Sequence, residues 1–227
     1  MDVSQLVQTV AIYAFPVLFA ITLHEAAHGY VARHFGDVTA YAQGRISINP
    51  TRHVDFVGTI VVPALLLAAT AGKFAFGWAK PVPVNYSALR KPRLHMALVA
   101  AAGPAANLAM LVLWAIAMRA FIELPESSSA EFLFKLAVAG VVVNLVLMAL
   151  NLLPILPLDG GRILAGALPR RLAMVFARTE ALGSWFFIAF AVFGVYDSTV
   201  NNGRLMAELF RPLNQFALEL LRGIAST

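Results

Sequence analysis

The stretch "ITLHEAAHGYVA", residues 21–32, places two histidines and a glutamate near the end of an apolar run. Helical residues four apart differ by about 40° in azimuth, so His24 and His28 would share one face and could bind one ion. Glu25 would lie about 100° around the helix, close enough to act on a water molecule at that ion. The pattern H-E-x-x-H is typical of zinc hydrolases, in which two histidines hold zinc and the glutamate is the general base.

The same residues could instead mark only the end of a helix, with their polar side chains reaching the membrane interface. The metal site is favoured because an ionisable group in an apolar helix costs at least about 2.5–3.5 kcal/mol and is by default functional. His53 is a single histidine, and we leave it open as a group that could support the site from outside the ligand set.

A catalytic zinc needs a third protein ligand, and the chain has no cysteine to supply it. We expect this ligand to be Asp159 in "NLLPILPLDGGRIL", where Pro154 and Pro157 end an apolar helix and leave extended backbone. The two glycines that follow allow close approach of other backbone. The aspartate could instead cap the next helix, or do both.

The elements that must position these residues are membrane helices. The chain has 227 residues, of which 60% are hydrophobic and 13% charged, and its mean hydropathy is +0.77. Soluble domains are about 45–50% apolar and about 25% charged. The net charge of +5 comes from residues in short loops between apolar segments. We therefore expect the lipid bilayer, and no nucleic acid, as a partner.

The fold class predicted is an all-α polytopic membrane protein with about four transmembrane helices. A helix needs about 20 apolar residues to cross a bilayer, and four stretches provide them, at roughly 5–33, 94–118, 132–153 and 179–197. A fifth apolar segment, 55–71, is shorter and either spans or re-enters. If it re-enters, 12 basic residues share one side and 5 the other, whereas spanning gives 8 and 9. The positive-inside rule then favours re-entry, with the N-terminus outside.

We divide the chain into an integral membrane domain, 1–200, and a tail, 201–227, that contains an amphipathic helix. This helix could lie on the bilayer, pack against a neighbouring protomer in a homo-oligomer, or gate access of the substrate.

The motifs "HEAAHGY", "GRISINPTRHVDFVGT", "FGWAKPVPVN", "AAGPAANL" and "NLLPILPLDGGRIL", in this order, resemble the site-2 protease (M50) family of intramembrane zinc metalloproteases. The resemblance covers about residues 15–170 and is to the small bacterial and archaeal members without a PDZ domain. At 53–56 the chain has "HVDF", where small relatives usually have His-Ile-Asp-Pro.

The resemblance implies one Zn²⁺ per chain, with His24, His28 and Asp159 as ligands and Glu25 as catalytic base. Asn151 matches a family asparagine that steadies the substrate or the oxyanion. Asn107 also matches the pattern, and packing or support of a substrate strand fits it as well as catalysis does.

The family function implied is hydrolysis of peptide bonds within or near transmembrane segments of protein substrates, in the cell inner (plasma) membrane, with the active site toward the cytoplasm. Segments 39–48 and 80–85 could form small β-edges that receive the substrate, or ordinary loops. The alternatives are a non-catalytic zinc-binding membrane scaffold, a metal transporter, and a hydrolase of lipids or prenylated peptides.

Overall fold

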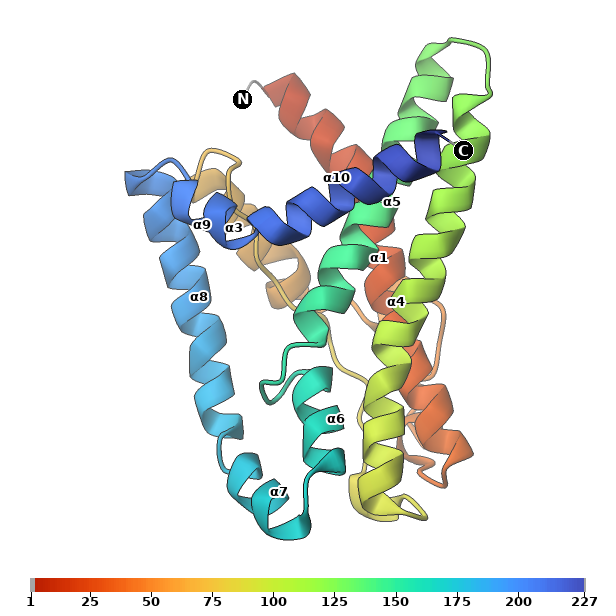
Figure 1. The fold of residues 1–227 in the computed structure, drawn as a ribbon, viewed down its shortest axis with the longest axis vertical. Coiled ribbons are helices and arrows are strands. Elements are labelled where there is room, and N and C mark those ends of the chain that lie inside the picture. The colour runs from red at the N-terminus through yellow and green to blue at the C-terminus, as the bar shows by residue number, and fades with distance from the viewer. Residues whose placement is uncertain (1–2, 227) are drawn as a thin grey trace.

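The computed structural model describes residues 3–226, and it assigns no strand to any of them. Four helices are long and apolar enough to cross a membrane (Figure 1). They are α1 (Val3–His34), α4 (Pro92–Ile122), α5 (Ser128–Asn151) and α8 (Glu180–Val200). Each coincides with one of the four predicted spans, so the predicted fold class is confirmed.

Local sequence signals account for several ends of these helices. Pro92 is the first residue of α4, where its missing N–H costs nothing. Ser127 caps α5, because its hydroxyl accepts a hydrogen bond from the Ala130 amide. At its other end α5 stops at Asn151, three residues before Pro154. The prolines therefore end this apolar segment as predicted.

The remaining elements are short. They are α2 (Thr39–Ala42), the 3₁₀ turns η1 (Pro50–Arg52) and η3 (Tyr86–Ala88), the π-helical turn η2 (Phe56–Val61), α3 (Val62–Ala69), α6 (Asp159–Ala167), α7 (Arg170–Ala177), α9 (Arg204–Leu209) and α10 (Arg211–Ser226). Of the two expected β-edges, 39–48 begins as α2, and 80–85 is coil that pairs with no strand in the described residues.

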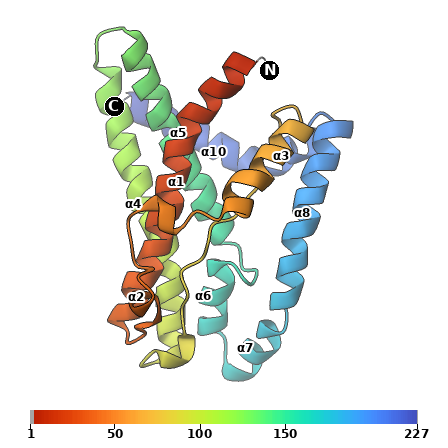
Figure 2. The same cartoon turned by 180° about the vertical axis from the view of Figure 1, so that it is seen from behind.

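The fifth apolar segment leaves one end of the bundle and the chain returns to the same end. The Arg90 amide donates a hydrogen bond of 3.1 Å to the Phe35 carbonyl, and the Arg90 guanidinium donates one of 2.6 Å to the His34 carbonyl. The end of α1 therefore lies beside the start of α4. Between them α3 runs toward the C-terminal end of α8, and the chain then returns to the start of α4 (Figure 2). This geometry supports the re-entrant interpretation.

Lys73 is an exception to the predicted distribution of basic residues. Its Nζ lies 2.8 Å from Oδ1 of Asn202, two residues after the end of α8. The turn after α3 therefore reaches the opposite end of the bundle from the start of α4. Lys73 is one of the twelve basic residues assigned to that side, so the bias keeps its direction.

The amphipathic tail packs onto its own chain. α4 packs against α1, α5 and α6, and α10 lies across α4 and α5 (Figure 1). Ala217 of α10 belongs to a buried cluster with Leu111, Val141 and Leu145, and Leu213 packs against it. Part of the apolar face of α10 is therefore covered by the bundle, while Phe216 remains 53% exposed. The division of the chain at residue 200 stays a prediction.

Candidate metal centre

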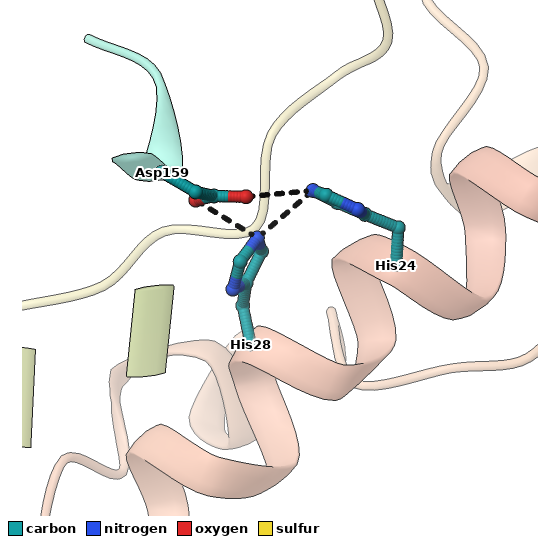
Figure 3. A group of neighbouring side chains, drawn as sticks. All are labelled: His24, His28 and Asp159. Atoms are coloured by element: carbon teal, nitrogen blue, oxygen red, sulfur yellow. Dashed lines mark hydrogen bonds and ion pairs between the residues drawn. The ribbon is translucent and has the colours of Figure 1, made fainter. Parts of the chain in front are cut away.

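Three predicted ligands meet where α1 faces the start of α6 (Figure 3). The Nε2 atom of His24 lies 3.1 Å from Oδ2 of Asp159, and Nε2 of His28 lies 3.4 Å from Oδ1 of the same carboxylate. The two Nε2 atoms are 3.1 Å apart. Asp159 is the first residue of α6, and the cap position belongs to Leu158. The aspartate side chain therefore faces the histidines and does not act as the N-cap.

The spacing of these atoms fits a tetrahedral ion. Zinc bonds of about 2.0–2.1 Å in tetrahedral geometry separate neighbouring ligand atoms by about 3.3 Å. The two Nε2 atoms are 3.1 Å apart, and their distances of 3.1 and 3.4 Å to different oxygens of Asp159 also lie near that value. The three side chains are only 9–11% exposed, so little water competes for them.

The protons of the cluster also indicate a cation. His28 Nδ1 lies 2.7 Å from the Val99 carbonyl, which can only accept, so His28 must donate there and its Nε2 carries an electron pair. His24 Nδ1 lies 2.6 Å from Oδ1 of Asn107, which gives the same result. Oδ2 of Asp159 is buried without a hydrogen-bond partner. With both imidazoles neutral, three electron-pair donors thus converge, an arrangement that a metal ion would stabilise.

A glycine of α4 makes room for the two imidazoles. A Cβ atom at Gly103 would lie 2.5 Å from Cε1 of His24 and 2.6 Å from Cε1 of His28. Any larger residue would therefore displace both rings. Gly103 belongs to the "AAGPAANL" motif, but no sequence pattern indicates that it lies against the predicted ligands.

The two glycines after Asp159 allow α6 to begin against the turn that follows α5. A Cβ atom at Gly161 would lie 2.5 Å from the carbonyl carbon of Ile155, and one at Gly160 would collide with the carbonyl oxygen of Leu152. This close approach of backbone to backbone brings Asp159 to the histidines, as the glycine pair predicted.

Glu25 lies beside the cluster on α1, and its carboxylate is held by segment 80–85. The Val82 amide donates a hydrogen bond of 2.7 Å to Oε2 of Glu25. Val82 lies between Pro81 and Pro83, which have no N–H to offer. A backbone amide has no signature in the sequence, so this partner could only be found from the structure.

The other candidate residues differ in whether they contact the cluster. Asn107 contacts His24, as described above. Asn151 lies in the last turn of α5, where its amide donates to the carbonyl of Leu147 in the same helix at 3.0 Å. His53 is buried in the loop before η2, with Nε2 2.8 Å from the Ser47 carbonyl. The structure thus brings Asn107 to the cluster, and the hydrogen bonds of Asn151 and His53 go elsewhere.

Tyr86 lies close enough to the centre to respond to its charges. Burial raises the pKa of its phenol above the ordinary value, Arg162 acts in the opposite direction, and the carboxylate of Asp159 raises the pKa further. The Arg162 guanidinium lies 5.0 Å from the centre of the Tyr86 ring. The phenol therefore remains protonated at neutral pH and can act only as a hydrogen-bonding group.

A bundle of membrane-length helices that holds two histidines, an aspartate and a neighbouring glutamate defines a membrane protein with a hydrolytic type of metal centre. Comparison with known proteins agrees. Residues 115–194, which include Asp159, match the family described as Peptidase family M50. No solved structure matches the chain.

Two relatives extend the similarity over most of the chain. YwhC of Bacillus subtilis is 36% identical over 209 residues, which are 87% of this chain and 91% of YwhC. Rip2 of Mycolicibacterium smegmatis is 31% identical over 184 residues, which are 75% of this chain and 68% of Rip2. Both names describe a zinc metalloprotease. The chain belongs to peptidase family M50 and is a membrane metalloprotease.

Proposed function

We propose that the chain binds one Zn²⁺ through His24, His28 and Asp159 and cleaves peptide bonds within or near transmembrane segments of membrane proteins. The observation that carries this proposal is the convergence of ligand atoms from His24, His28 and Asp159 beside Glu25. Two imidazoles and a carboxylate form a ligand set that leaves a fourth position for water or substrate.

Each side chain then has a defined task. When bound, zinc lowers the pKa of a water molecule and polarises a carbonyl group. Glu25 takes a proton from that water and delivers it to the leaving amine, while the Val82 amide keeps its carboxylate in place. Asn151, at the end of α5, is proposed to steady the substrate carbonyl, for which its amide must leave the Leu147 carbonyl.

The substrate must be extended before it can be cut. A peptide bond in a transmembrane helix is hydrogen-bonded and shielded, so local unwinding has to precede attack. Segment 80–85 is coil and contacts Glu25 through Val82. A substrate strand laid beside it would bring a carbonyl group to the position that the three ligands leave open.

We place the protein in the inner (plasma) membrane with the active site toward the cytoplasm. The histidines lie in the last third of α1, close to the end where α1 meets α4. Most basic loop residues are assigned to this end, and such residues face the cytoplasm. Water then has a short path to the metal ligands.

The rival functions could use the same metal ligands, but neither needs Glu25 as a base. A metal transporter needs ion ligands and an exit route but no base held beside them. A non-catalytic zinc-binding scaffold needs the metal ligands but no base. The carboxylate held at a fixed position next to the cluster favours hydrolysis over both.

The first test is the zinc content of the purified protein, measured by elemental analysis. We expect about one zinc per chain in the wild type and a loss of zinc in His28→Ala and in Asp159→Ala. The matched control is Asp197→Ala, which removes a buried aspartate bonded to the Leu205 and Met206 amides far from the cluster. This variant should keep its zinc. A folded wild type that takes up no zinc on reconstitution would overturn the proposal.

A further inference from the structure

A line of hydrogen bonds leads from His24 across α4 into α5. Nδ1 of His24 lies 2.6 Å from Oδ1 of Asn107, and Nδ2 of Asn107 donates to Oδ1 of Asn144 at 3.0 Å. Nδ2 of Asn144 donates in turn to the carbonyl of Gly140, one turn earlier in α5, at 2.9 Å. Both asparagines are 0% exposed. Solvent water therefore does not compete for these hydrogen bonds.

The Gly140 carbonyl determines which group donates and which accepts in each of these hydrogen bonds. The Gly140 carbonyl can only accept, so the NH₂ group of Asn144 must face it and its oxygen must face Asn107. Asn107 must then present its own NH₂ group to Asn144, which leaves its oxygen toward His24. Since that oxygen accepts, the proton of His24 must be on Nδ1. The electron pair of Nε2 then points to Asp159.

We propose that Asn144 is a positioning residue of the metal centre, which acts through Asn107 to hold His24 in the tautomer that can bind metal. An asparagine amide can turn over and exchange its oxygen and nitrogen at little cost in shape. Without Asn144, Asn107 can turn its NH₂ group toward His24, which favours the tautomer with the proton on Nε2. This inference rests on the proposed function through the metal.

Helix packing alone is the competing explanation for this pair. Buried asparagines hydrogen-bond neighbouring membrane helices to each other, typically with small gains in stability. Such a role needs a bond between α4 and α5 but no particular direction of it. The two explanations therefore differ in what happens to His24 when the direction is lost.

The tautomer can be read without metal by nitrogen NMR of metal-free protein labelled at its five histidines, with His24→Gln used to assign the signal. We expect the wild-type His24 to carry its proton on Nδ1 and Asn144→Leu to show a substantial fraction with the proton on Nε2. A wild-type His24 protonated on Nε2 overturns the proposal, and this result needs no variant of Asn144 to fold.

Zinc affinity, measured by competition with a chelator, provides the second readout. Loss of a group that orients a ligand typically weakens metal binding 10–100-fold, and we expect this for Asn144→Leu. The decisive variant is Asn107→Asp combined with Asn144→Leu. An ionised carboxylate accepts on either oxygen and needs no neighbour to orient it, so affinity should return to within about threefold of Asn107→Asp alone.

A pure packing role predicts no such recovery, because the bond between α4 and α5 is absent in the double variant. The matched control is Thr22→Val, which removes a buried hydroxyl bonded only to the Leu18 carbonyl of its own helix and should leave zinc affinity unchanged. An unaltered tautomer in folded Asn144→Leu, or an unrecovered double variant, overturns the proposal. If the wild type takes up no zinc, the proposed function fails, whereas an unaltered tautomer in Asn144→Leu beside a wild type that binds zinc makes only the inference about Asn144 fail.

Discussion

Two sides of the bundle are joined by different kinds of contact. Around the metal ligands, buried polar groups hydrogen-bond α1 to α4 and α4 to α5. α8 instead meets the re-entrant segment through aromatic rings. Phe76 and Phe187 have ring centres 6.2 Å apart, and Phe74 and Phe190 have ring centres 6.1 Å apart.

Polar contacts to α8 occur at its two ends. Glu180 at the start of α8 pairs with Arg162 at 3.2 Å, and Lys73 reaches Asn202 just beyond its other end at 2.8 Å. Hydrogen bonds are directional and fix side-chain geometry to a few tenths of an ångström, whereas ring contacts tolerate tilt and sliding. The side chains around the predicted ligands are therefore held in fixed positions, whereas the contacts of α8 can deform at a lower cost in free energy.

The largest effect should come from a change on the ligand side that leaves its packing intact. Gln in place of Glu25 keeps the size of the side chain and an oxygen for the Val82 amide, but it is no base. We expect Glu25→Gln to fold and to bind zinc while cleavage falls by about 10²–10⁴-fold. Cleavage of a labelled transmembrane substrate, with zinc measured on the same sample, tests this. Cleavage at the wild-type rate would remove Glu25 from its proposed role.

Gly103→Ala tests whether the imidazole rings of His24 and His28 can move. The new Cβ meets both imidazoles, whose positions are fixed by Asn107 and Val99. We expect zinc affinity to fall at least about tenfold, as for other losses of ligand orientation, and stability to fall by about 1–3 kcal/mol. Chelator competition and thermal unfolding measure the two effects. Wild-type affinity would mean that the rings can move freely, contrary to the comparison.

On the α8 side, Phe190→Ala should loosen packing without altering the metal centre. Phe190 has ring contacts with Phe74, Phe76, Phe186 and Phe210. Each such pair is worth about 0.5–1.5 kcal/mol, so we expect a lower unfolding temperature. Zinc content should equal that of the wild type. A loss of zinc in the folded variant would show that packing at α8 affects the metal centre, contrary to this expectation.

The smallest effect is expected for Gly194→Ala, the counterpart of Gly103→Ala on the α8 side. The atoms nearest to its Cβ belong to the ring of Phe74, the far end of a side chain that can turn aside. We expect a change in stability below about 1 kcal/mol and no change in zinc affinity. Thermal unfolding of both alanine variants, side by side, gives the cleanest measure of the difference. Equal losses in the two would contradict it.

Much of the centre could be predicted from the sequence. His24 and His28 share a face because they are four residues apart on a helix, which is a property of the helix and of nothing beyond it. The proposed role of Asp159 was predicted from prolines and glycines that break the helix around it, together with the family pattern. An asparagine inside the apolar run "VVVNLVLMALN" was also visible as a signal, but nothing in the sequence tells which polar group Asn144 meets.

The membrane helices, the face that carries the histidines and the residue types able to bind zinc follow from the amino-acid order alone, because hydrophobic length and helical period are local properties. The packed fold was needed to show that Val82 holds Glu25, that Gly103 admits both rings, that Lys73 lies at the opposite end, and that Asn107 joins the centre. Each of these depends on how segments far apart in the chain pack, and the directions of hydrogen bonds exist only once donor and acceptor have met.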